Sequence, residues 1–178
     1  LALGDLYRVG GDAPRAAHYY SAVLGLPQYR ADGLIGLARL DAAAGRTAQA
    51  TSRFQQAAAV RPSDPRPHAN LGYYRYLAGD LPGALAAYRS ATVLAPRDAR
   101  LWGTYGALLL ASGQPREAEA ALQRSLAIAP RDDVLSNLGT LRYQAGDYAG
   151  AARLYRAAVA RQPEAFRFHG HLGDALQA

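Results

Sequence analysis

Turn-forming, small and apolar residues recur along the chain with a period of about 34 residues. A Gly returns in steps of 34, 34, 34 and 33 residues, and a following Ala and a large side chain keep the same steps. The series are Gly11, Gly45, Gly79, Gly113 and Gly146; Ala16, Ala50, Ala84, Ala118 and Ala151; and Tyr20, Phe54, Tyr88, Leu122 and Tyr155. Proline closes successive units at Pro62, Pro96, Pro130 and Pro163. A fixed period of this length indicates an array of stacked supersecondary units.

Each unit predicts two helices joined by a tight turn. The first helix carries an apolar residue followed by a small one, as in Leu71-Gly72, and the small residue allows a partner helix to approach closely. The recurrent Gly ends this helix, because glycine adopts a left-handed conformation without steric cost. Asp12, Asp80 and Asp147 directly follow that Gly and are placed to cap the second helix. The recurrent Ala is expected at the tightest crossing of the two helices, and the closing Pro ends the unit.

Two stretches are nearly identical: residues 70–91 read NLGYYRYLAGDLPGALAAYRSA and residues 137–158 read NLGTLRYQAGDYAGAARLYRAA. One helix pair cannot bury its own apolar face, so repetition of this kind favours stacked copies. The pattern resembles the tetratricopeptide repeat over essentially the whole chain. This resemblance implies an all-α fold, a right-handed superhelical solenoid of helix pairs in a single domain, residues 1–178. The expected units are about 1–30, 31–64, 65–98, 99–131 and 132–165, with a half-unit at 166–178.

Some positions depart from the repeat. Ala38 replaces the usual Gly of its unit, and Asp41 stands where an aromatic residue is usual, which we expect to change local packing only. The aromatic first-helix position holds Leu34, His68, Trp102, Leu135 and His169 in successive units. At the end of the chain, Leu172 and Leu176 are expected to expose apolar surface. That surface predicts either a longer parent chain, which we favour, or self-association through uncapped ends.

Composition narrows the possible functions. All 20 basic residues are Arg, Cys and Met are absent, and the formal net charge is +6. Without cysteine, a disulfide framework and a thiolate metal site are excluded, and the redox compartment stays open, with the cytoplasm slightly favoured over the periplasm. The chain has no starting Met, so we interpret it as a piece of a longer protein. Its apolar stretches are too short for a membrane span.

The resemblance places candidate binding residues on the first helices, which line the concave face in this family. By register, the exposed positions also include Asp32, Ile35, Thr104, Ala107 and Thr140. Arg forks onto carboxylates and Tyr supplies rigid contact area, so a central cluster of Arg66, Tyr73, Tyr76 and Arg100 suits an extended peptide with acidic and apolar side chains. The alternative is a solvated groove with ordinary surface arginines. The predicted peptide-binding residues are Arg39, Arg66, Asn70, Tyr73, Tyr76, Arg100, Asn137 and Tyr143.

More specific sites are not supported. Only Asn70 and Arg100 match the five positions of the clamp with which some family members hold a C-terminal carboxylate, and an asparagine ladder also fails. His169 and His171 point to different helix faces, so packing is favoured over metal binding. Asp132 and Asp133 begin a helix, where capping explains them. Arginines surround the whole circumference, so nucleic acid is not an expected partner.

No catalytic motif, cofactor or metal site is predicted, and the sequence favours a protein–protein interaction scaffold over an enzyme. Two alternatives stay open. One is a regulatory repeat arm of a larger bacterial signalling enzyme, either a serine/threonine kinase or a cyclase. The other is a periplasmic scaffold for polysaccharide export or pilus assembly.

Overall fold

The computed structural model describes residues 1–178 and is built of α-helices without a β-strand, which confirms the all-α class. The chain forms two compact units, Leu1–Leu94 (unit 1) and Ala95–Ala178 (unit 2), each described by itself. The helices of unit 1 are α1 (Ala2–Val9), α2 (Ala13–Ala22), α3 (Arg30–Ala43), α4 (Thr47–Val60), α5 (Pro65–Leu77) and α6 (Leu81–Leu94). Those of unit 2 are α7 (Ala99–Ala111), α8 (Pro115–Ile128), α9 (Asp132–Gln144), α10 (Tyr148–Arg161) and α11 (Phe166–Gln177).

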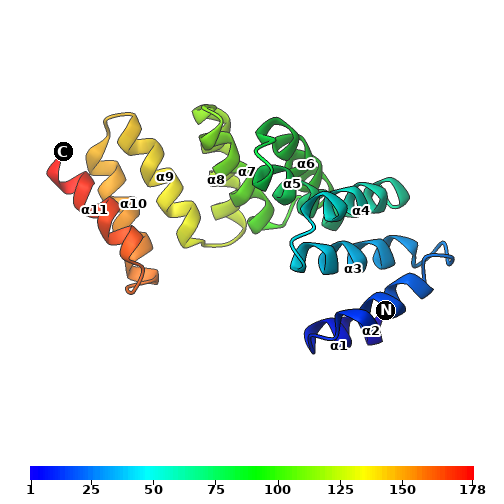
Figure 1. Cartoon of the computed structure of the whole chain (residues 1–178). Coiled ribbons are helices and arrows are strands. Elements are labelled where there is room, and N and C mark those ends of the chain that lie inside the picture. Colours follow the sequence, from blue (N-terminus) through cyan, green and yellow to red (C-terminus); the bar gives the residue numbers. More distant parts are fainter. The chain divides into compact units, whose positions relative to one another are not determined.

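The helices follow one another as pairs, visible in Figure 1 as neighbouring coils joined by short turns. We call the odd-numbered helices first helices and the even-numbered ones second helices. Within unit 1, α3 packs on α4 and α5 on α6, and α4 also contacts α5. Unit 2 repeats this arrangement, because α9 packs on α10 and α10 contacts α11. Each apolar face is therefore buried against a sequence neighbour, as expected for stacked repeats.

The turns within the pairs form as the sequence predicts. All five recurrent glycines have positive φ, between 74° and 81°, and no other residue does. The Asp12 side chain accepts a hydrogen bond from the Arg15 N–H at 3.0 Å, and so caps α2. Asp80 and Asp147 cap α6 and α10 in the same way, at 2.9 and 2.8 Å. Predicted turn and cap are both confirmed.

The small residues of the first helices lie against the large residues of the second helices. A Cβ added at Gly72 would lie 2.6 Å from the Tyr88 ring, and one at Gly139 would lie 2.6 Å from the Tyr155 ring. The recurrent alanines are fully buried, and the large residues four positions later are also buried. The helix pairs therefore have no room for larger side chains at these positions, which confirms the predicted close crossing.

The aromatic first-helix position fastens each helix to the preceding turn. The Trp102 indole N–H donates to the carbonyl of Pro96 at 3.1 Å. The rings of His68 and His169 bond the corresponding proline carbonyls through Nε2, at 3.2 and 2.7 Å. Because a carbonyl only accepts, Nε2 must carry the proton in both histidines. That nitrogen is therefore engaged in the structure and not free to ligate a metal, in keeping with the packing interpretation.

Asp41 has a more specific role than the altered packing that the sequence predicts. It is buried, and its carboxylate accepts a hydrogen bond from Arg46 Nε at 2.9 Å and a second one from Arg53 Nη1. The two arginines come from the turn after α3 and from α4. An ion triad thus joins the two helices where an aromatic residue is usual, because a buried carboxylate requires charged partners.

The last helix corrects one expectation. Leu176 is exposed, as predicted, but Leu172 is partly buried and packs against a core cluster that includes Ala151 and Tyr155. The difference follows from the contact of α11 with α10, which covers the side of α11 that carries Leu172.

Candidate functional site

In unit 1, the first-helix residues predicted to bind a partner lie mainly on α5. Tyr73, Tyr76 and Leu77 are 47%, 49% and 56% exposed, at a spacing that places them on one side of the helix. The amide of Asn70, one turn earlier, donates to the carbonyl of Arg66 at 2.8 Å. We call Asn70, Tyr73, Tyr76 and Leu77 the α5 surface. Three large, partly apolar side chains in a row on an exposed helix are characteristic of a contact surface.

The neighbouring first helix, α3, contributes one free charge. Arg39 is exposed and its guanidinium has no ion pair or hydrogen bond within the chain. Ile35, also predicted as an exposed position, is instead buried in the core cluster with Phe54 and Leu71. The register prediction fails there because α3 is covered on several sides by its neighbours, including α2 and α4. Arg39 is therefore the side chain of α3 that is available to a ligand.

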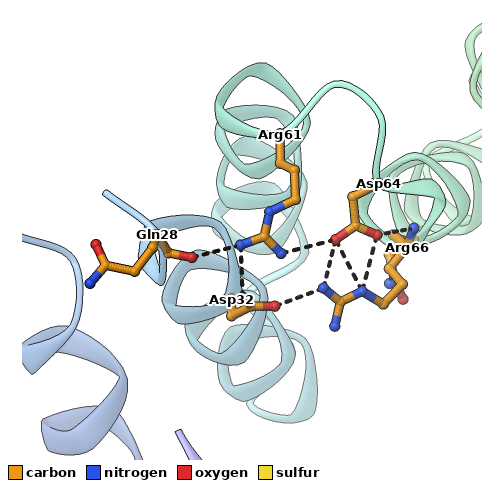
Figure 2. Close-up of polar contacts among 6 residues, drawn as sticks. Gln28, Asp32, Arg61, Asp64 and Arg66 are labelled. Carbon is orange, nitrogen blue, oxygen red and sulfur yellow. Dashed lines mark hydrogen bonds and ion pairs between the residues drawn. The ribbon is translucent and has the colours of Figure 1, made fainter. Parts of the chain in front are cut away.

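Arg66 is held inside the chain. Its guanidinium donates to Asp64 at 2.6 Å and, across the helices, to Asp32 at 2.7 Å. Arg61 donates to the other oxygen of Asp32 at 2.9 Å and to the carbonyl of Gln28, also at 2.9 Å. Figure 2 shows the two guanidinium groups on either side of these carboxylates. We call Asp32, Arg61, Asp64 and Arg66 the arginine clamp; it joins α3, the end of α4 and the start of α5.

The arginine clamp changes the acidity of its members. Burial alone would raise the pKa of Asp32, but the hydrogen bonds from Arg61 and Arg66 outweigh it and hold the pKa below its usual value. The pKa of Asp64 is likewise lowered, since its bonds to Arg66 outweigh its burial. The bond to Asp64, followed by the bond to Asp32, raises the pKa of Arg66 further above its normal range. Arg66 therefore already has two carboxylate partners and is not the free fork that the sequence suggested.

Sequence reasoning missed this clamp, although two signals were present. Asp64 stands two residues before Arg66, where it also caps α5 through the Arg66 N–H at 2.9 Å. Asp32 and Arg66 are 34 residues apart, which is one repeat, so they occupy the same position on successive first helices. Opposite charges at the same register of neighbouring repeats predict a cross-repeat ion pair.

In unit 2, Arg100 extends from the start of α7. Its side chain is 68% exposed, and its ion pair with Asp98 is long, at 4.0 Å. Asp98 mainly caps α7, through the backbone N–H groups of Arg100 and Leu101. A pair this long and exposed contributes little, so the Arg100 guanidinium stays available. Thr104 and Ala107 follow on the same helix and are partly buried.

The other predicted residues of unit 2 lie on α9 and are partly buried. The Tyr143 ring contacts Tyr148 edge-on, with centroids 5.1 Å apart. The Thr140 hydroxyl lies 3.2 Å from the hydroxyl of Tyr155, whose pKa is raised chiefly by its burial. Asn137 is also partly buried. The structure adds a residue here, since His171 Nδ1 lies 3.2 Å from the Ser136 hydroxyl and its ring is 5.2 Å from that of Tyr155.

The acidic pair at the start of α9 differs from expectation. The N-cap residue is Arg131, and neither Asp132 nor Asp133 makes the predicted capping bond. Asp133 instead accepts two bonds from Arg131, at 3.1 and 2.7 Å, while Asp132 pairs with Arg161 at the end of α10. The shortened unit removes one residue from the preceding loop, so the helix begins at Asp132 itself. No group of three or more His, Asp or Glu side chains forms a metal site in the structure.

Comparison with known proteins identifies the fold. A family model described as tetratricopeptide repeat matches residues 35–99 and 136–177, which together are more than half of the chain. A second model of the same description matches residues 75–139. No curated protein matches the chain in sequence. None of its helices is long and apolar enough to cross a membrane.

Solved structures agree with the family models. The crystal structure of MamA superposes with a TM-score of 0.80 at 18% identity, over 93% of this chain and 97% of that one. TTC0263, a thermophilic repeat protein of Thermus thermophilus, gives a TM-score of 0.68 at 23% identity, over 100% and 97% of the two chains. YrrB, described as a repeat protein with an unusual peptide-binding site, gives 0.80 at 18% identity, over 94% and 87%. At these identities the likeness is one of fold.

Proposed function

Because the chain belongs to the tetratricopeptide repeat family, we propose that it is an interaction scaffold whose first helices bind a peptide or protein segment. The proposal gives the chain a binding role, without a catalytic step or a cofactor. The partner we propose carries both acidic and apolar side chains. YrrB, which shares the fold, supports a peptide as the bound species through its own peptide-binding site.

The α5 surface carries this proposal. Tyr73, Tyr76 and Leu77 leave roughly half of their area in water, although the remainder of unit 1 buries its large apolar residues well. Tyrosine combines large contact area with a polar tip and loses little conformational entropy on binding, so it is enriched where binding energy concentrates. A partner that covers these rings removes apolar area from water, which favours association by about 25 cal/mol per Å² before the costs of binding.

Charge specifies the acidic part of the partner. All six carboxylates of unit 1 are in ion pairs with its own arginines: Asp5, Asp12, Asp32, Asp41, Asp64 and Asp80. Arg39 is left without a carboxylate on a first helix, so an anion that pairs with it must come from a ligand. We therefore assign the anchoring role in unit 1 to Arg39, and a structural role to Arg66. In unit 2, Arg100, Asn137 and Tyr143 complete the proposed set.

The test is a comparison of partner capture by two variants. Tyr73→Thr with Leu77→Gln gives α5 the residues that α9 carries at the same positions, so the fold tolerates them, and Arg39→Gln removes the free charge. The control carries Arg153→Gln and Arg156→Gln on the second helix α10. Partners isolated from lysate and identified by mass spectrometry should be lost with the triple variant and kept by the control. Equal capture by both variants rules out the first-helix surface as the binding site.

The two alternatives from the sequence, a regulatory arm and a periplasmic scaffold, remain predictions. They differ from an independent scaffold in what surrounds the repeats in the gene. A kinase or cyclase domain in the same reading frame would favour the first, and a signal peptide or an outer-membrane barrel the second.

A further inference from the structure

A second apolar surface lies on the other side of the α5–α6 pair. A cleft of about 560 Å³ opens there, lined mainly by Pro62, His68, Ala86, Arg89, Val93 and Leu94. We call it the α6 cleft. Its lining comes from the turn before α5 and from the outer side of α6, and it includes none of the residues of the α5 surface.

The polar groups of the lining are already satisfied by the chain. The His68 ring bonds the Pro62 carbonyl at 3.2 Å, and the hydroxyl of Ser90, also in the lining, donates to the Ala86 carbonyl at 3.1 Å. Val93 is 71% exposed and presents a bare apolar side chain at the cleft. Water in such a site gains few hydrogen bonds, so replacing it by an apolar side chain is favourable.

One charge at the cleft has no partner. The Arg89 guanidinium is exposed and makes no ion pair, hydrogen bond or ring contact within the chain. No carboxylate lines the cleft. Every carboxylate of unit 1 already pairs with another arginine, so unit 1 supplies no counterion for Arg89. The cleft is therefore complementary to a ligand group that is apolar and carries a negative charge beside it.

The twin stretch in unit 2 shows that this combination does not follow from the repeat itself. On α10, Arg153 stands at the position of Ala86, Ala160 at that of Val93, and Arg161 at that of Leu94. The corresponding surface of α10 is thus more basic and less apolar. The apolar cleft with a single free arginine is a property of this helix pair.

We propose that the α6 cleft is a second binding surface, which takes a large apolar side chain followed by a carboxylate from a protein partner. The apolar side chain occupies the cleft against Val93 and Leu94, and the carboxylate pairs with Arg89. This surface is separate from the first-helix surface and does not depend on it.

The experiment is an NMR titration of the ¹⁵N-labelled full chain with two small probes, acetyl-Phe-Glu-amide and acetyl-Phe-Gln-amide. With the Glu probe, saturable shifts are expected at the amides of α6 and of residues 62–68. The Gln probe, which lacks the negative charge, should bind about two- to fivefold more weakly, as expected for one exposed ion pair. Arg89→Gln should remove this preference, whereas Arg156→Gln on α10 should leave it intact.

A second variant tests the apolar part. Ala86→Arg with Val93→Ala gives α6 the residues of α10, so the helix is expected to fold, and it should lose the shifts from both probes. The proposal is overturned by equal affinity for the two probes, by shifts centred on the α5 surface, or by the absence of saturable binding. Because the readout is local to α6, the result is independent of whether the first-helix proposal holds.

Discussion

The stretches 70–91 and 137–158 share most of their sequence and adopt the same local structure, yet present different surfaces. In both, a Gly of the first helix lies against the ring of a buried Tyr, at the same 2.6 Å spacing for an added Cβ. In both, the turn Gly has φ near 80° and the next Asp caps the second helix. The scaffold positions are therefore interchangeable between the two repeats.

The differences concern residues that the scaffold does not use. Tyr73 is exposed on α5, whereas Thr140 at the same position bonds the hydroxyl of Tyr155. Tyr76 and Tyr143 are the same residue type at the same position, but only Tyr143 is packed, against Tyr148 and a core cluster. Identity of sequence thus predicts the helix pair, while its neighbours decide which side chains remain free.

The largest expected effect comes from the shared scaffold. Gly72→Ala and Gly139→Ala each place a methyl group against a buried Tyr ring, so both should lower the free energy of unfolding by about 1–3 kcal/mol. Gly173→Ala meets nothing within 4 Å and should raise it by about 0.5–1 kcal/mol, because alanine favours helices. Urea unfolding followed by circular dichroism measures all three. Unequal losses at Gly72 and Gly139 would show that the two scaffolds differ.

A smaller effect is expected where identical residues have different surroundings. Tyr143→Ala removes a packed ring and should cost about 1–2 kcal/mol. Tyr76→Ala removes an exposed ring and should change stability by less than about 0.5 kcal/mol. The same unfolding experiment applies. A loss at Tyr76 as large as that at Tyr143 would mean that the α5 surface is structural.

The smallest effect concerns the arginine clamp, for which the twin stretch has no counterpart of the same extent. The folded-state pKa values of Asp32 and Asp64 are lowered, so their ion pairs contribute fully above the ordinary carboxyl pKa of about 4 and are lost as the pH falls below it. Asp32→Asn should cost less than about 1 kcal/mol near neutral pH. Its free energy of unfolding should also fall less steeply with acid than that of the wild type. Parallel curves would mean that Asp32 has a normal pKa in the folded chain.

Most of the fold, but less of the site, could be predicted from the sequence. Gly79, Asp80 and Ala84 have roles set by local helix geometry, which recurs at every period, so their register sufficed. Arg66 was misjudged because its partners lie on another helix and in the preceding turn, and such pairing depends on side-chain geometry. Ile35 was misjudged because burial depends on several neighbouring helices at once. The free arginines, Arg39 and Arg89, became evident only after every carboxylate of unit 1 had been assigned.

The equivalence of Gly72 with Gly139, and of Tyr88 with Tyr155, has a consequence for inheritance. The gene encodes two nearly matching segments 67 codons apart, which favours unequal recombination between them. A crossover inside the pair deletes or duplicates two whole repeats and keeps the reading frame. The joined helix pair would still set a glycine against a tyrosine ring, so its product keeps a foldable unit. Repeat number in such a lineage can change in single events, without passing through a broken intermediate.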